Sequence, residues 1–164
     1  GGETDEVISE KVRAALKHHL IPIVCIGETL EERQAGRVDQ VLDRQLEAIF
    51  GDLSKMQAEK IILAYEPRWA IGSDRLPSTQ EIYQVRVMLR KWLLERLGSA
   101  TEERIAVLYG GSVKASFLGA VSWEAEMDGV LVGRESLFPF EVVKMMLLLE
   151  GAEKDNLIDT ETTL

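Results

Sequence analysis

The strongest candidate for chemistry is a single carboxylate, Glu66, in the middle of the stretch 60–72, KIILAYEPRWAIG. The run of Ile, Leu and Ala before it is typical of a strand buried on both faces of a parallel sheet, and Pro67 ends that strand. A glutamate at the carboxyl end of such a strand lies where parallel α/β folds place their active sites. The simpler interpretation is a solvated glutamate beside a turn.

Glycine-bearing turns follow three of the predicted strands. Gly72 follows the Glu66 segment, residues 110–112 (Gly-Gly-Ser) follow the next strand, and Gly133 follows the last. Glycine lets backbone N–H groups approach a ligand closely, which suits a phosphate. Each turn alone is more simply a connection. Their common placement beside a carboxylate favours a site for a phosphorylated compound.

The elements that must position these residues alternate along the chain. One helix is followed by four units of a strand and a helix, which predicts an α/β fold with a parallel sheet and right-handed crossovers. The pattern fits both an open doubly wound sheet and half of a (β/α)8 barrel. Hydroxyl–acid capping boxes mark two helix starts, at Thr29–Glu32 and Ser78–Glu81. The expected strands are 21–27, 60–66, 104–109 and 128–132, and the expected helices are 4–19, 29–50, 78–97, 115–121 and 142–149.

Length and charge restrict the class of protein. The 164 residues suffice for one domain, expected at 1–150, with 151–164 as a polar, acidic and partly disordered tail. The net charge of −9 argues against nucleic acid or an anionic membrane as partner. An anionic substrate would therefore need a local site of backbone N–H groups.

The single cysteine and the two histidines carry little signal for chemistry. Cys25 cannot form an internal disulfide and is predicted to be a small core residue in a cytoplasmic protein. His18 and His19 have no second ligand at suitable spacing, so no metal site is predicted. No signal peptide is recognised, and no apolar run approaches the roughly 18 residues of a membrane span.

Several strings in a fixed order resemble the triosephosphate isomerase family. The resemblance extends over roughly residues 2–150 and implies a (β/α)8 barrel of which this chain is about half: the helix before strand 5, then units 5 to 8. The strings are IPIVCIGET at 21–29, AYEPRWAIG at 64–72, LYGGSV at 108–113 and DGVLVG at 128–133, with ETDE at 3–6 and ETLEERQAG at 28–36.

This resemblance implies a reaction and its base. Glu66 matches the residue that moves a proton between two carbons of the substrate, interconverting glyceraldehyde 3-phosphate and dihydroxyacetone phosphate in glycolysis and gluconeogenesis. The backbone N–H groups of Gly72, Ser112 and Gly133 match those that hold the substrate phosphate, and Arg134 is placed with them. No cofactor is implied.

Other matching positions support the site. Pro67 to Trp69 match the first hinge of a lid over the substrate, Tyr109 matches the latch of that lid, and Glu28 resembles a supporting acid. Arg90 and Asp128 resemble a structural ion pair.

Three departures from the family pattern affect the expected function. The lid tip reads Gly72-Ser73-Asp74-Arg75-Leu76-Pro77, with an added acid and a rigid proline. Arg134 replaces the second glycine of the last phosphate turn, where its side chain could crowd the phosphate or lie outside. No segment matches the electrophilic histidine and the active-site lysine, which belong to the first half of the barrel.

Three functions therefore remain open. The first is a half of triosephosphate isomerase that is inactive without the other half. The second is an isomerase for a related sugar phosphate, and the third is a non-catalytic half-barrel that assembles or binds phosphate compounds. Two open sheet edges predict self-association or pairing with a separate N-terminal half-barrel.

Overall fold

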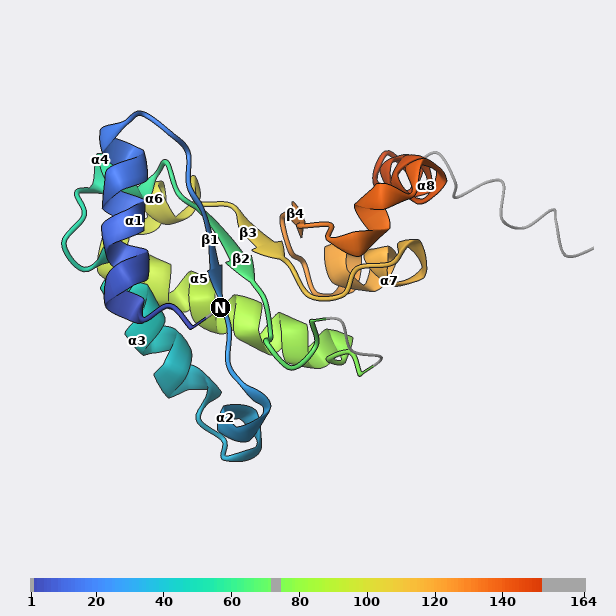
Figure 1. The fold of residues 1–164 in the computed structure, drawn as a ribbon, viewed down its shortest axis with the longest axis horizontal. Helices are drawn as coiled ribbons and strands as arrows, with labels where there is room; N and C mark the ends of the chain where they lie inside the picture. Colours follow the sequence, from blue (N-terminus) through green and yellow to red (C-terminus); the bar gives the residue numbers. More distant parts are fainter. Residues whose placement is uncertain (1, 72–74, 152–164) are drawn as a thin grey trace, which may run out of the picture.

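A parallel sheet in the order β1-β2-β3-β4 forms the centre of the computed structural model, which describes residues 2–71 and 75–151 (Figure 1). Its register pairs Ile23 with Ile62, Leu63 with Val107, and Leu108 with Gly129. The alternation of strands and helices thus gives the predicted parallel order. The strands are β1 (Ile23–Ile26), β2 (Ile62–Tyr65), β3 (Val107–Tyr109) and β4 (Gly129–Val130).

Helices connect the strands, and both predicted capping boxes form. Thr29 and Glu32 bond reciprocally at the start of α2, as do Ser78 and Glu81 at the start of α5. The longer helices are α1 (Asp5–Lys17), α3 (Val38–Phe50), α5 (Thr79–Leu97) and α8 (Pro139–Leu149). The shorter ones are α2 (Leu30–Gln34), α4 (Lys55–Ala58), α6 (Ser99–Glu102) and α7 (Ala115–Gly119), with a π-helical turn η1 (Ala120–Glu124) and a 3-10 turn η2 (Arg134–Leu137).

Three predicted elements have different bounds. The single helix expected at 29–50 is two helices, because Gly36 adopts a left-handed backbone with φ of 67° between them. The helix expected at 115–121 continues into η1. The strand expected at 128–132 pairs over only two residues.

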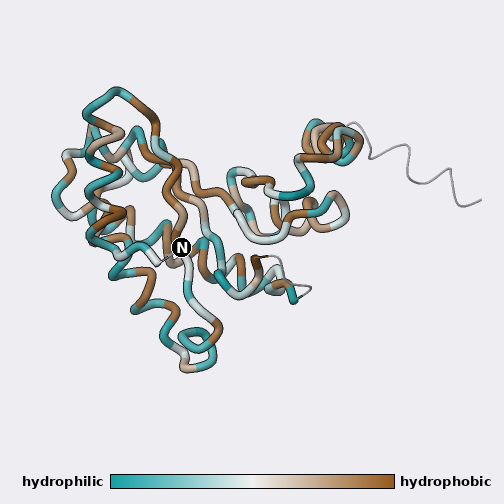
Figure 2. The backbone as a smooth tube through the Cα atoms, viewed as in Figure 1, coloured by the Kyte–Doolittle hydropathy of each residue, from teal (hydrophilic) through white to brown (hydrophobic). Residues whose placement is uncertain are grey.

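The core lies between the sheet and the helices α3 and α5. Leu63 of β2 and Val107 of β3 have no exposed surface, and neither do Leu42 of α3 and Leu89 of α5. The brown strands in Figure 2 run through this layer. The predicted Arg90–Asp128 ion pair is confirmed and joins α5 to the start of β4, where Asp128 also accepts from the N–H of Val107 at 2.6 Å.

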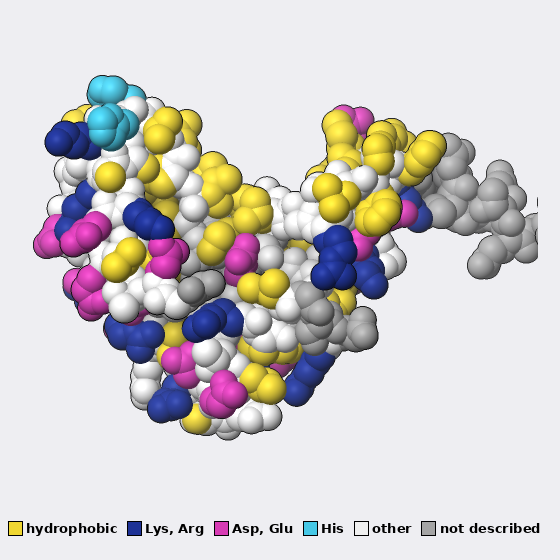
Figure 3. Space-filling view, viewed as in Figure 1, with side chains coloured by type: hydrophobic (Ala, Val, Ile, Leu, Met, Phe, Trp, Pro, Cys, Tyr) yellow, Lys and Arg dark blue, Asp and Glu magenta, His cyan; other side chains and the backbone are white. Residues whose placement is uncertain are grey.

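The opposite face of the sheet is open within the described residues. Along β1, Val24 and Ile26 are buried, whereas Ile23 and Cys25 are exposed. The prediction that Cys25 is a core residue is therefore wrong, since no described segment covers its face of β1. Figure 3 shows apolar side chains along the hollow between the two ends of the molecule.

The C-terminal unit packs least. Of α8, only Met145 is buried, and α8 lies at the far end of the molecule from α1 (Figure 1). Beyond Gly151, the predicted tail lies outside the described residues. No helix among the described residues is both long and apolar enough to span a membrane. Apolar side chains exposed on η2 and α8 are Leu137, Phe138, Phe140, Val143, Met146, Leu147 and Leu149.

Candidate active site

Glu66 is the first residue after β2. Its backbone N–H donates a hydrogen bond to the carbonyl of Ile26 at 2.7 Å, which fixes its position next to β1. Two glycines make room for it. A Cβ on Gly27 would overlap the carbonyl oxygen of Glu66, and one on Gly110 would lie 2.6 Å from its Cγ and 2.8 Å from its Oε1. The ends of β1 and β3 therefore approach Glu66 so closely that only glycine fits at both positions.

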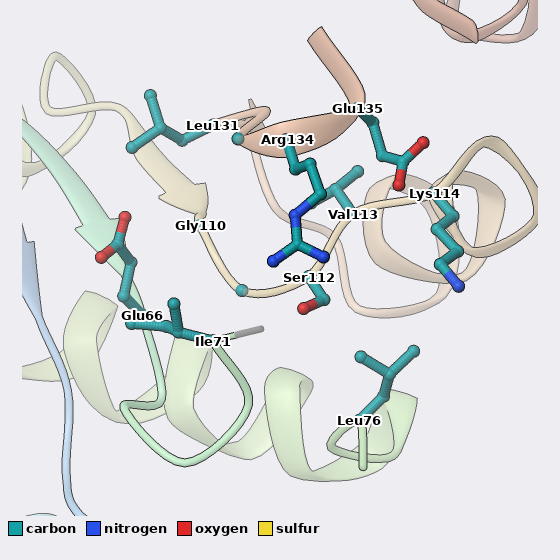
Figure 4. Close-up of a pocket in the computed structure, with 12 residues that line it drawn as sticks. Glu66, Ile71, Leu76, Gly110, Ser112, Val113, Lys114, Leu131, Arg134 and Glu135 are labelled. Carbon is teal, nitrogen blue, oxygen red and sulfur yellow. The ribbon is translucent and has the colours of Figure 1, made fainter. Parts of the chain in front are cut away.

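A pocket of about 440 Å³ opens in front of Glu66. It brings together Glu66, Ser112, Gly133 and Arg134, which come from the ends of three different strands (Figure 4). Gly72, which is also predicted to bind the phosphate, lies outside the described residues. The predicted convergence of strand ends at one site thus exists for the residues that the structure describes.

The wall of the pocket opposite Glu66 carries groups suited to an anion. Within residues 2–71 and 75–151, the N–H groups of Ser112 and Gly133 donate no hydrogen bond, while the Ser112 hydroxyl donates to the Ala70 carbonyl at 2.9 Å. The Arg134 side chain reaches into the pocket above Ser112, whereas the Lys114 ammonium points away (Figure 4). Of the two placements left open for Arg134, the side chain takes the inner one.

Glu28, two residues after β1, stands behind the predicted hinge and has no exposed surface. Its Oε1 accepts from Trp69 Nε1 at 2.8 Å and from Arg33 Nε at 2.8 Å, and its Oε2 accepts from the Tyr65 hydroxyl at 3.2 Å. Its carbonyl accepts from the N–H of Arg68 at 3.0 Å. A buried carboxylate needs such partners, so Glu28 is a structural residue that holds Arg68 and Trp69, within the segment predicted to be the hinge.

The sequence reasoning named Glu28 and Trp69 but missed Arg33, which pairs with that acid. Its only signal was its place in the helical turn that follows Glu28. Tyr109, the predicted latch, is fully buried, and its hydroxyl has no hydrogen-bond partner in the described part of the chain. Burial, and after it the charge of Glu28, raises the pKa of Tyr109, which is therefore a neutral phenol.

Cys25 was also missed as a neighbour of the site. Desolvation of its sulfur and then the charge of Glu66 raise the pKa of this thiol to about 12. Neither histidine of the chain lines the pocket, because His18 and His19 follow the end of α1. No cluster of His, Cys, Asp or Glu in the described ranges is arranged to hold a metal ion.

Comparisons with known proteins agree with this geometry. The family model described as triosephosphate isomerase matches residues 1–148. The chain is 46% identical to the triosephosphate isomerase of Alkalilimnicola ehrlichii over 137 residues, and 44% identical to that of Emericella nidulans over the same length. Each match covers 84% of this chain and 54% or 55% of the relative, so the chain spans about half the length of the curated relatives it matches. The chain belongs to the triosephosphate isomerase family, and its sheet is a partial barrel of that family.

Proposed function

We propose that the chain forms the C-terminal half, strands five to eight, of a triosephosphate isomerase barrel and works with the four strands that complete such a barrel. The reaction is the interconversion of glyceraldehyde 3-phosphate and dihydroxyacetone phosphate, in cytoplasmic glycolysis and gluconeogenesis. The observation that carries this proposal is that Glu66 and the turns at Ser112 and Gly133 line one and the same pocket.

In this proposal Glu66 is the general base. Its carboxylate takes a proton from the carbon next to the carbonyl and returns it to the neighbouring carbon, so one group serves both steps. The N–H groups of Gly72, Ser112 and Gly133, with the Arg134 guanidinium, hold the phosphate and fix the distance from the reacting carbons to the base. Pro67 to Trp69 and Tyr109 act as hinge and latch of the lid.

The chain lacks one part of the chemistry. Proton removal leaves negative charge on the carbonyl oxygen, and a hydrogen-bond donor has to stabilise that oxyanion. No imidazole lines the pocket within the described residues, since both histidines follow α1. The four strands that complete the barrel are therefore proposed to supply the donor.

The partner is proposed to be a first half-barrel or a second copy of this chain. Among the described residues, β1 and β4 each have one strand neighbour, so each leaves an unpaired edge that another strand can extend. Light scattering at micromolar concentration is expected to show self-association. A monodisperse monomer would contradict pairing between copies and leave the first half-barrel as the partner.

The test is isomerase activity on glyceraldehyde 3-phosphate, with and without a polypeptide for the first half-barrel. We expect no turnover by the chain alone and turnover after mixing. Glu66→Gln in the mixture is expected to reduce kcat by about 10²–10⁴-fold, the usual contribution of a positioned base. An inactive mixture of folded halves would overturn the proposal.

The absence of an imidazole at the pocket favours one alternative, a non-catalytic half-barrel that binds phosphate compounds. If the chain is such a half-barrel, it should bind phosphate and show no turnover with either partner. If it is an isomerase for a related sugar phosphate, it should turn over a longer aldose phosphate and little glyceraldehyde 3-phosphate. The same assay with both substrates separates the three functions.

A further inference from the structure

Both ends of the connection between β2 and α5 contact one guanidinium, that of Arg33 on α2. Arg33 Nε donates to Glu28 Oε1 at 2.8 Å, Nη1 to Glu81 Oε1 at 3.2 Å, and Nη2 to the Tyr65 hydroxyl at 3.2 Å. Tyr65 precedes Glu66, and Glu81 belongs to the first turn of α5. One side chain from a third segment thus joins residues on the two sides of the connection.

At the N-terminal end of this connection, Arg33 and Glu28 also contact Trp69, in the predicted hinge. Trp69 donates to the same Glu28 oxygen that Arg33 binds, and its ring centroid lies 5.3 Å from the Arg33 guanidinium carbon. This arrangement fixes the indole on two sides, by a hydrogen bond and by a cation–π contact. Trp69 is three residues after Glu66, so the cluster fixes the backbone on which the base is mounted.

At the C-terminal end of the connection, Arg33 contacts Glu81, which also belongs to the capping box of α5. Glu81 Oε2 accepts from the N–H of Ser78 at 2.8 Å and from its hydroxyl at 2.9 Å, which closes the start of α5, while Oε1 faces Arg33. Arg75, next to that end, lies over the Trp69 ring with its guanidinium carbon 5.5 Å from the centroid. The two ends of the connection therefore meet at Arg33 and Trp69.

The burial of this cluster separates it from ordinary surface ion pairs. The Arg33 side chain is 18% exposed and Glu28 is not exposed at all. A planar guanidinium presents several donors in a fixed arrangement, so it can bind several acceptors at once with little further loss of freedom. A lysine at this position has one ammonium and cannot take the place of three separate donor atoms.

We propose that Arg33 is a positioning residue for the site: it couples residues 66–71 to residues 75–81, so that the hinge after the base and the start of α5 hold one arrangement. The proposal rests on the proposed function for its relevance to catalysis. Its physical content, the coupling of two chain segments, is measured without turnover, so failure of one does not imply failure of the other.

The sharpest variant is Glu81→Gln. Glutamine retains the capping box, as Gln57 does with Ser54 in α4 of this chain, but it removes the charge that pairs with Arg33. The readout is limited trypsin digestion of the full chain, since Arg68 and Arg75 are cleavage sites at the two ends of the connection. Cleavage of a native chain follows the population of locally open states.

We expect Glu81→Gln to raise the initial cleavage rate at Arg75 and Arg68 about two- to fivefold, the loss of one partly exposed ion pair. The urea midpoint should stay close to that of the wild type. The matched control is Glu95→Gln, the same change on the same helix at an exposed pair with Lys91. Cleavage at Arg75 equal to the wild type and to this control would overturn the proposal.

A double-variant cycle gives a second, independent test. Arg33→Lys is expected to raise cleavage at both sites, and adding Glu81→Gln to it should change the rates no further, because the coupling is already lost. Fully additive effects would mean that the two residues act separately and would overturn the proposal. Equal increases at the remote site Arg104 would mean general loosening and would also overturn it.

Discussion

Two glutamates follow neighbouring strands, and their surroundings differ completely. Glu28 after β1 has no exposed surface and accepts hydrogen bonds from Arg33, Tyr65 and Trp69. Glu66 after β2 faces an open pocket and has no ion-pair partner in the described part of the chain. Both acids lie at the carboxyl edge of the same sheet, so the difference comes from the side chains that surround each one.

The difference shows which tasks the chain completes with its own residues. A buried carboxylate must be paired within the fold, and the side-chain partners of Glu28 come from residues 33–69. A carboxylate that takes a proton from a substrate must be free of strong partners, as Glu66 is. The structural acid is therefore satisfied by its neighbours in the described residues, whereas the acid proposed for the chemistry lines the pocket.

The largest expected contrast between the two acids is in stability. Glu28→Ala leaves Arg33 half-buried without its main partner, which should lower the free energy of unfolding by about 3–5 kcal/mol. Glu66→Ala removes a group without such partners and should change it by less than about 1 kcal/mol. Urea unfolding of both variants measures the difference. Equal losses would contradict the distinction between a structural and a free acid.

The next contrast concerns two arginines: Arg33 is held by acids, whereas Arg134 reaches into the pocket from the wall opposite Glu66 (Figure 4). Arg134→Gly should weaken binding of inorganic phosphate about tenfold, because it removes a charge-assisted contact. Lys114→Ala is the matched control, since Lys114 lines the same pocket with its ammonium turned away. Phosphate titrations followed by NMR measure the dissociation constant of each variant. A larger loss for the Lys114 variant would reverse the assignment.

Local patterns explain what the sequence predicted correctly. The capping pair Ser78–Glu81 marks the start of α5 because capping is decided within four residues. The parallel order of the strands follows from the alternation of strands and helices. The convergence of Glu66 with Ser112 and Gly133 follows in turn, since the carboxyl ends of parallel strands share one edge.

Contacts between distant residues explain what was missed. Beyond its place in the turn after Glu28, Arg33 carries no local signal, because its partners are spread over positions 28, 65, 69 and 81. The exposure of Cys25 depends on which segment covers its face of β1, and no pattern inside 21–27 contains that information. The inward direction of Arg134 likewise depends on the shape of the pocket and not on the turn alone.

The smallest expected effect tests how closely Glu66 is coupled to its neighbour Cys25. Although part of Cys25 is exposed, the surrounding chain partly desolvates its sulfur, and this desolvation, then the charge of Glu66 and the hydrogen bond with Glu66, raise the pKa of the thiol to about 12. A raised pKa means that folding favours the protonated thiol. The contribution of this thiol to the free energy of unfolding is therefore fully present below about pH 9 and is lost as the pH rises toward 12. Alkylation requires the thiolate and should therefore be slow at pH 9 in the folded chain.

Glu66→Gln removes the charge and leaves the desolvation of the sulfur. The alkylation rate of Cys25 at pH 9 should then rise a few-fold, yet stay below the rate in urea, where the desolvation is also lost. Glu135→Gln is the matched control, because Glu135 lines the same pocket but does not contribute to the pKa of Cys25. An unchanged rate in Glu66→Gln would mean that the charge of Glu66 does not act on the thiol, because neutral glutamine would then be equivalent to the carboxylate.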